Sequence, residues 1–229
     1  MKRKLRLRDK MRPVCKGEIP YKEIRQYGDA EPYLEERIGA YCSYCEMPIK
    51  HVPEVEHIES RSKGGALTEW DNLLLACKYC NTRKSNLVAK GEKENYLWSD
   101  EDDTFHPYSY SNGIAQINEE YLKSTDSDYA EHARKLFELV KLGNVPNERN
   151  KDRRFFWRNE AYNDAVDSKE GWIKVRETKQ KSVFLKNMII AAKNSGFFST
   201  WMEVFKDDEE VKRALIDEFN GTRKEIFEE

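Results

Sequence analysis

Two pairs of cysteines constrain this chain more than any other feature. Each pair has the spacing C-x-x-C, and about thirty residues separate the pairs, at Cys42, Cys45, Cys77 and Cys80. Each C-x-x-C places two thiols on one tight turn, and two such turns supply the four thiolates of a tetrahedral Zn²⁺. Four sulfur ligands leave no open position for water. We therefore expect a structural zinc whose binding energy contributes to folding.

The composition favours a folded, cytoplasmic protein. Of 229 residues, 38% are hydrophobic, which is enough to supply a core. The chain contains no apolar run long enough to cross a membrane, and the basic start MKRKLRLRDK leads into no apolar segment. We expect neither a membrane span nor a signal peptide. In a reducing cytosol, paired cysteines are more often metal ligands than disulfides, and Cys15 is left as an ordinary thiol.

Charge is distributed unevenly along the chain. The formal net charge is −2, whereas nucleic-acid-binding proteins normally present a basic surface. Residues 1–12 carry seven basic side chains and one acidic side chain, and residues 203–229 carry ten acidic and five basic side chains. The basic end can meet phosphate and the acidic end can face another protein. A solvated tail is the alternative at each end.

We expect an α+β fold in three regions. Residues 1–36 form a basic N-terminal arm that packs only partly, and residues 37–92 form the cysteine-bearing core. Residues 93–229 begin with an acidic connector at 99–113 and then become mostly helical.

Three helices are predicted in this C-terminal region. Apolar residues recur at three- and four-residue spacing over 129–140. The stretch 183–192 is nearly all apolar, so it should be the buried helix of this half. A last helix begins at a cap formed by Asp207 or Asp208 and ends near Gly221.

The pattern from the first cysteine pair onward predicts two strands and a helix. Residues 53–58 alternate as in a β-strand, 61–65 form a glycine turn, and 73–76 are a second, apolar strand. Residues 78–89 favour a helix because no proline interrupts them. The predicted order is strand, strand, helix, with a cysteine pair at each outer edge.

The residue types in this segment suit phosphodiester hydrolysis. That reaction needs a water molecule deprotonated near neutral pH, and the ordinary histidine pKa of about 6.5 suits that task. His57 is therefore the candidate general base. The reaction also builds negative charge that a divalent cation neutralises, and Mg²⁺ needs only a carboxylate and an amide oxygen beside its waters.

The combination of E-H, G-G, D-N and C-x-x-C-N-x-x-K at these spacings resembles the HNH endonuclease family, whose ββα-metal core has the same order of elements. The resemblance implies His57 as the general base, with Glu56 and Asn81 as ligands of a catalytic Mg²⁺, for which Mn²⁺ is an alternative. It also implies that Asn72 fixes the loop between the strands, so that a backbone carbonyl orients the imidazole.

The same resemblance places Arg83 and Lys84 within reach of substrate phosphates. A solvated helix face is the alternative for Lys84. One position departs from the family pattern, because Glu56 stands where the family usually has aspartate. Strand alternation also directs Glu56 and His57 to opposite faces unless the backbone bulges.

The C-terminal region contains a basic aromatic run, RNKDRRFFWRNEAY, at 149–162. Such a run can hold phosphates and stack bases, but it is also the pattern of an amphipathic helix whose rings pack inward. We favour packing of the rings into the core.

The ending at 199–222, with the size and order of the chain, resembles the HNH nuclease subunit of Septu-type anti-phage systems, including those linked to retrons. This resemblance implies a separate ATPase subunit that holds and restrains the nuclease. Our hypothesis is that the acidic C-terminal half docks on that ATPase. We therefore predict a Mg²⁺-dependent HNH endonuclease that cuts DNA within a defence complex. An RNA-cutting HNH nuclease is one alternative, because nothing in the sequence reads a 2′-hydroxyl. A non-catalytic zinc module is the other, although such a module needs neither His57 nor Asn81.

Overall fold

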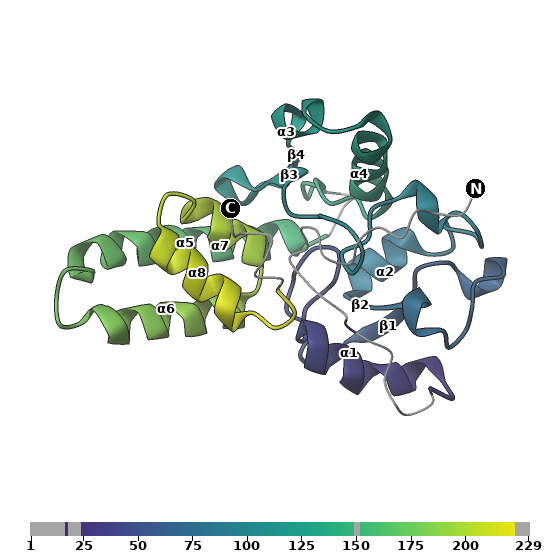
Figure 1. The fold of residues 1–229 in the computed structure, drawn as a ribbon, viewed down its shortest axis with the longest axis horizontal. Helices are drawn as coiled ribbons and strands as arrows, with labels where there is room; N and C mark the ends of the chain where they lie inside the picture. Colours follow the sequence, from purple (N-terminus) through teal and green to yellow (C-terminus); the bar gives the residue numbers. More distant parts are fainter. Residues whose placement is uncertain (1–16, 18–23, 149–151, 223–229) are drawn as a thin grey trace.

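The computed structural model describes residues 17, 24–148 and 152–222. Short strands and surrounding helices form one part of the molecule, and the helices α5 to α8 form an elongated second part beside it (Figure 1). The predicted α+β class is confirmed. The basic run 1–12 and Cys15 lie outside the described residues.

The predicted order of strand, strand and helix is present. The strand β1 (Glu54–His57) pairs antiparallel with β2 (Leu73–Ala76), which is entirely buried. The helix α2 (Lys78–Lys84) follows directly and is capped by Cys77, whose Sγ accepts from the first turn. The helix is shorter than predicted, because Ser85 has a φ of 44° and this left-handed backbone ends it.

The described end of the predicted N-terminal arm belongs to the core. It forms the 3₁₀ turn η1 (Tyr27–Ala30) and the helix α1 (Glu31–Ile38). Ala30 and Leu34 are completely buried. Because η1 packs against β1 and α1 against β2, this segment forms one side of the strand pair.

The acidic connector at 99–113 is packed rather than extended. Asp102 accepts a hydrogen bond from the Trp98 backbone at 2.8 Å, and Asp103 accepts from the Phe105 backbone at 2.9 Å. Carboxylates that satisfy turn N–H groups in this way can be buried at little cost. Two short strands, β3 (Tyr108–Ser109) and β4 (Gln116–Ile117), form a hairpin around the end of the connector.

Helices dominate the rest of the described chain: α3 (Glu119–Lys123), α4 (Ser127–Leu139), α5 (Arg154–Val175), α6 (Lys181–Ser195), α7 (Phe198–Val204) and α8 (Glu209–Glu218). Further 3₁₀ turns are η2 (Arg61–Lys63), η3 (Trp70–Asn72), η4 (Lys93–Asn95) and η5 (Ser111–Gly113).

The helix predictions for α4 and α8 are confirmed, and Asp208 caps α8 by accepting from Val211 N at 3.1 Å. The prediction of a buried helix at 183–192 is wrong for one face of α6. Val183 is 59% exposed and Ile190 is 48% exposed, because only one side of α6 meets α5 and α8.

The prediction that the rings of 149–162 pack inward is wrong for two of them. Phe156 is 54% exposed and Trp157 is 36% exposed, whereas Arg154 and Arg158 of the same helix are buried. In the first turns of α5 these arginines therefore take inward positions. Residues 149–151 lie outside the described part of the chain.

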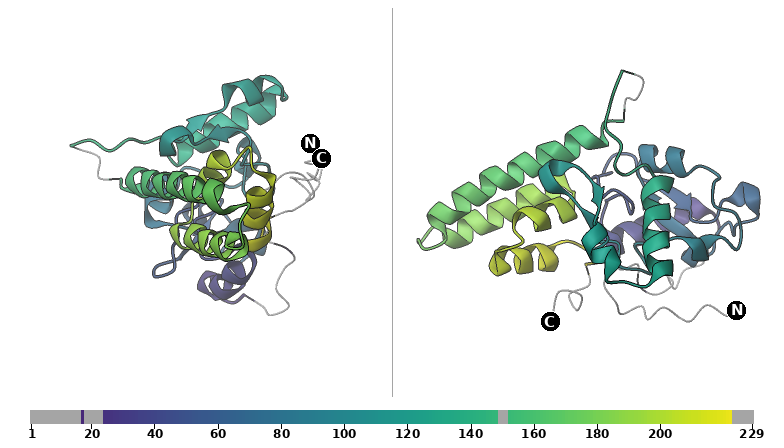
Figure 2. Two further views of the ribbon diagram at one scale, coloured as in Figure 1. Left: turned by 90° about the vertical axis from the view of Figure 1, so that its left-hand side faces the viewer. Right: turned by 90° about the horizontal axis from the view of Figure 1, so that it is seen from above.

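Buried apolar residues form two clusters. The first surrounds β1 and β2 and continues through α4 to Leu142, past the predicted boundary at residue 92. The second lies among α5 to α8, which pack together as a group of helices (Figure 2). Glu46, next to the first cysteine pair, joins them at the start of α7, since its backbone oxygen accepts from Phe197 N at 3.0 Å and its carboxylate accepts from Ser199 N at 2.9 Å.

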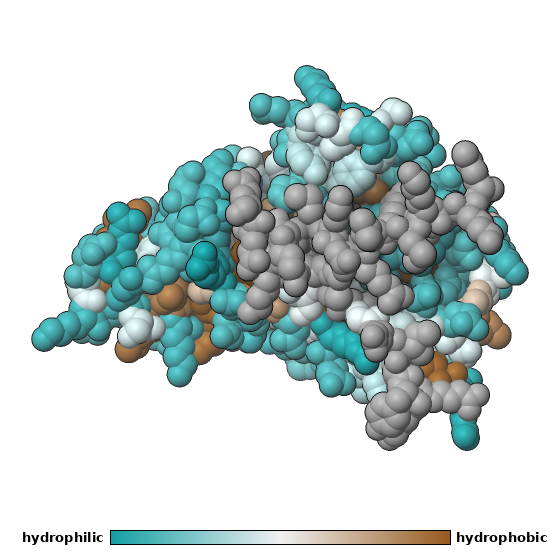
Figure 3. Space-filling model, in the orientation of Figure 1, coloured by the Kyte–Doolittle hydropathy of each residue, from teal (hydrophilic) through white to brown (hydrophobic). Residues whose placement is uncertain are grey.

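The described residues on the face in Figure 3 are mostly hydrophilic. Separate hydrophobic patches lie over the α5–α6 side and at the opposite end of this face. Among the helices of the described ranges, none combines the length and the apolar character that crossing a membrane requires.

Candidate active site and metal centre

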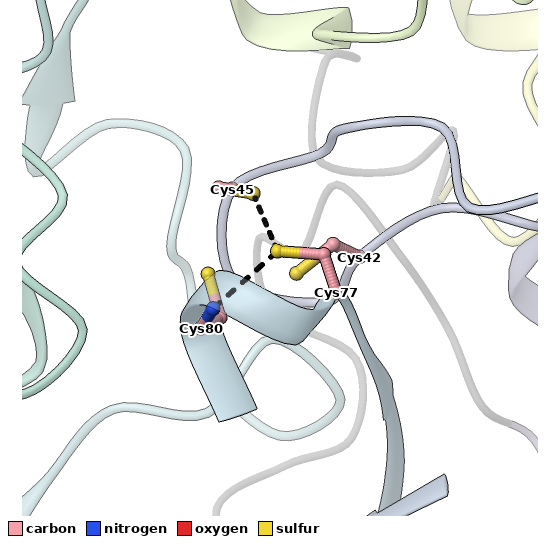
Figure 4. Close-up of side chains that lie close together, drawn as sticks. All are labelled: Cys42, Cys45, Cys77 and Cys80. Atoms are coloured by element: carbon pink, nitrogen blue, oxygen red, sulfur yellow. Dashed lines mark hydrogen bonds between the residues drawn. The ribbon is translucent and has the colours of Figure 1, made fainter. Parts of the chain in front are cut away.

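The four cysteines of the two C-x-x-C pairs meet at one point (Figure 4). Their sulfur atoms lie within 4.8 Å of one another, and each residue is at most 1% exposed. Burial raises the pKa of the Cys80 thiol, and hydrogen bonds with the neighbouring thiols raise it further. A bound cation offsets this by stabilising thiolates. Four buried, free thiols in this arrangement are the donor set of a structural zinc site.

An arginine from the helical part reaches this centre. Arg154 Nη1 lies 3.0 Å from Cys80 Sγ, and Nη2 pairs with Asp152 at 2.6 Å and donates to the Lys141 carbonyl at 3.0 Å. A guanidinium that donates to a ligand sulfur offsets part of the negative charge of a four-thiolate site. Nothing in the local sequence indicated this role, because 74 residues separate the two partners.

The helix α2 lies against the carboxylates of β1. Lys78, Asn81 and Lys84 recur every three residues and so share one face of α2. Glu54 accepts from Asn81 Nδ2 at 2.6 Å and pairs with Lys78 at 3.2 Å. Glu56 pairs with Lys84 at 3.1 Å. These contacts hold α2 in register with β1.

His57 has a defined orientation. Its Nε2 lies 2.9 Å from the Leu67 carbonyl oxygen. Because a carbonyl only accepts, we assign the ring proton to Nε2, which leaves Nδ1 as the proton acceptor. Partial burial, followed by the charges of Arg61 and Lys84, lowers the pKa of His57 despite the opposing effect of the Leu67 contact. The imidazole is therefore neutral near pH 7, as a general base must be.

Asn72 binds the loop next to His57 and does not line the open groove that His57 faces. Its Oδ1 accepts from Glu59 N at 2.8 Å, and its Nδ2 donates to the carbonyls of Glu59 at 3.1 Å and Ala66 at 2.7 Å. The Ala66 contact lies next to the Leu67 carbonyl. Asn72 thus holds the loop from which that carbonyl reaches the imidazole.

An open groove of about 590 Å³ runs between β1, the turn η2 and the end of α2. Glu56, His57 and Asn81 all line it, although Glu56 is buried against Lys84 while His57 is partly exposed. The strand therefore directs the two neighbours differently, yet both reach the same groove. Arg61 and Tyr27 line the groove as well.

Two residues that line this groove, Glu56 and Asn81, carry oxygen atoms of the kind that bind a divalent cation. Within the described residues, Glu56 Oε1 is buried without a hydrogen-bond partner. Burial raises the pKa of Glu56, and the charge of Lys84 opposes this effect. Asn81 uses its amide nitrogen toward Glu54, so that contact does not engage its oxygen. One unpaired carboxylate oxygen and one amide oxygen suit an ion that retains several waters.

The prediction that Lys84 contacts phosphate is wrong in this structure. Lys84 is completely buried and donates to the His57 carbonyl at 2.6 Å as well as pairing with Glu56. Its ammonium compensates the buried carboxylate of Glu56 and also binds the His57 backbone, so Lys84 stabilises this end of β1. Arg83, in contrast, is exposed on the outer side of α2.

A four-cysteine centre beside a strand pair and a helix, with an oriented histidine near oxygen donors, is the arrangement expected of a metal-dependent phosphodiesterase. Comparison with known families agrees, since residues 42–87 match the profile of the HNH endonuclease family. The chain therefore contains an HNH endonuclease domain. No curated protein and no solved structure matches the chain.

Proposed function

We propose that the chain hydrolyses nucleic acid with His57 as the general base and with Glu56 and Asn81 as the ligands of a catalytic Mg²⁺. The contact between His57 Nε2 and the Leu67 carbonyl carries the proposal, because it leaves Nδ1 free to take a proton from water. A bound Mg²⁺ would supply positive charge to the phosphate and the departing oxygen. Asn72 keeps the His57 imidazole oriented, because it holds the loop that carries the Leu67 carbonyl.

The substrate is proposed to be DNA, with RNA as the alternative. A cleavage assay with plasmid, single-stranded DNA and tRNA distinguishes the two. Cleavage of at least one substrate that stops on addition of EDTA is the expected result. Binding without cleavage of all three would favour the non-catalytic zinc module, which the HNH family match already disfavours.

Replacement of Glu56 by glutamine should raise the Mg²⁺ concentration needed for half-maximal cleavage by roughly tenfold or more, the scale seen when metal coordination is disturbed. The reason is that a neutral amide replaces the buried carboxylate oxygen that lacks a partner. Mg²⁺ titrations of the cleavage rate measure the effect.

Lys84→Met is the matched control, because it breaks the same ion pair but keeps the carboxylate. Equal Mg²⁺ dependence of the two variants would show that the ion pair, and not metal ligation, explains the change. Thermal unfolding of both variants checks that the core survives.

We further propose that the nuclease works in an anti-phage complex with an ATPase subunit, on the resemblance of residues 199–222 and the overall order of the chain. The apolar face of α8 is buried, so its acidic outer face, including Glu209 and Glu210, is the part that a partner can reach. Co-elution of the purified chain with an ATPase subunit of such a system measures the association. Co-elution unchanged by Glu209→Lys with Glu210→Lys would remove α8 from the interface.

A further inference from the structure

Tyr27 lies at the candidate active site although it is outside the segment that matches the HNH family, residues 42–87. Its ring centroid is 5.0 Å from that of His57, with the planes at 56°. The side chain is 40% exposed and lines the groove. A large aromatic ring therefore forms one wall of the groove beside the proposed base.

The turn that carries Tyr27 is well anchored. Asp29 Oδ2 accepts from the backbone of Arg25 at 3.1 Å and of Gln26 at 2.9 Å, and Ala30 is completely buried. Because η1 also packs against β1, the turn places the Tyr27 ring beside the His57 ring on that strand. A preorganised ring loses little side-chain entropy when it binds a flat partner.

Arg61 also lies close to the Tyr27 ring. Its guanidinium carbon is 5.8 Å from the Tyr27 centroid, and the side chain is exposed at the start of η2. Within the described ranges Arg61 forms no ion pair, so its charge is available to a ligand. An exposed ring with a neighbouring guanidinium, next to a phosphate-cleaving centre, has the chemistry of a nucleotide site.

We propose that Tyr27 stacks on the base of a nucleotide flanking the scissile phosphate and that Arg61 binds a phosphate of the same strand. This inference rests on the proposed function, since it assumes that the phosphate is presented to His57. A base inside a duplex is already stacked on both faces and cannot stack on a side chain without leaving the helix. The substrate class that fits is thus a strand with an unpaired nucleotide at the cut, such as a single strand, a loop or a bulge.

Binding to uncleaved strands tests the stacking role apart from catalysis. In the zinc-loaded full chain carrying His57→Ala, the affinity for a labelled single-stranded oligonucleotide is measured by fluorescence anisotropy. Tyr27→Leu should weaken binding roughly 5- to 150-fold, the range for loss of one stacked base, whereas Tyr27→Phe should retain it. A fully paired duplex should bind more weakly than the single strand and respond less to Tyr27→Leu.

Abasic oligonucleotides separate stacking from simple packing of Tyr27 on His57. An abasic residue is placed at each position of the oligonucleotide in turn. At one position it should weaken binding by the chain with Tyr27 but should not change the affinity of the Tyr27→Leu chain. If Tyr27→Leu weakens binding equally for every abasic strand, or has no effect, the inference is overturned.

Arg61→Gln should weaken binding to all strands and reduce the salt dependence by about one phosphate contact, while Lys63→Gln in the same turn should change neither. Equal effects of the two variants would overturn the role of Arg61.

The proposed catalytic function can be refuted independently of the stacking site. A chain with intact His57 that cuts nothing but binds single strands through Tyr27 would refute the catalytic proposal and leave the stacking site standing. Unchanged cleavage by the Tyr27→Leu chain would refute the stacking site and leave the catalytic proposal standing.

Discussion

Replacement of His57 by alanine should lower the rate of phosphodiester cleavage about 10²- to 10⁴-fold, the contribution of a positioned general base. The variant loses the imidazole that the Leu67 carbonyl orients at the groove, and the described residues that line this groove include no second histidine to take the proton from water. Single-turnover cleavage of a 5′-labelled oligonucleotide at saturating Mg²⁺ measures the loss. Zinc content and thermal unfolding should stay near those of the unmodified chain, because the imidazole contacts no cysteine in the described structure.

His51→Ala is the matched control for this prediction. His51 is also a histidine between the two cysteine pairs, but it is exposed and does not line the groove. It should retain full activity. Undiminished cleavage by a zinc-loaded His57→Ala chain would falsify the assignment of the base, whereas a loss in both variants would indicate a general effect on this segment.

The parts of the site that could be predicted from sequence have local determinants. Each C-x-x-C pair forms one turn, so its two thiols are neighbours whatever the rest of the fold does. The strand that contains Glu56 and His57 was predicted from a few neighbouring residues, and Asp208 caps a helix that begins beside it. Such features are determined by residues that are close in sequence, so they can be predicted without knowledge of the contacts between distant segments.

The remaining features depend on contacts between distant segments. A lysine is almost always exposed, so the burial of Lys84 follows only from how α2 crosses β1 and brings Glu56 to it. Arg154 was part of a run that resembled either a nucleic-acid surface or an amphipathic helix, and its partner Cys80 belongs to another region. Tyr27 reaches the groove because η1 packs on β1. No periodic pattern in the sequence predicts these contacts between distant residues.

Loss of the zinc centre should have the largest effect on stability. Cys77→Ser removes one of the four thiolates and also the sulfur that caps α2 by accepting from Cys80 N at 3.4 Å. Structural zinc sites contribute roughly 10–16 kcal/mol of binding free energy in zinc-finger peptides, which matches or exceeds the roughly 5–15 kcal/mol stability of a domain. The strand pair and α2 should therefore unfold in this variant, and cleavage should be lost with them.

The second apolar cluster predicts how far this unfolding spreads. The helices α5 to α8 bury their own core around Trp172 and Trp201, so much of the helical circular-dichroism signal should remain in Cys77→Ser. Zinc per chain by atomic emission should fall well below one, and added Zn²⁺ should restore neither stability nor activity. Cys15→Ser controls for removal of a thiol and should bind one zinc. A Cys77→Ser chain that unfolds at the original temperature and still cuts would show that the cysteine centre is dispensable. In that case the contacts of Lys84 and Asn81 with β1 would have to hold the active site unaided.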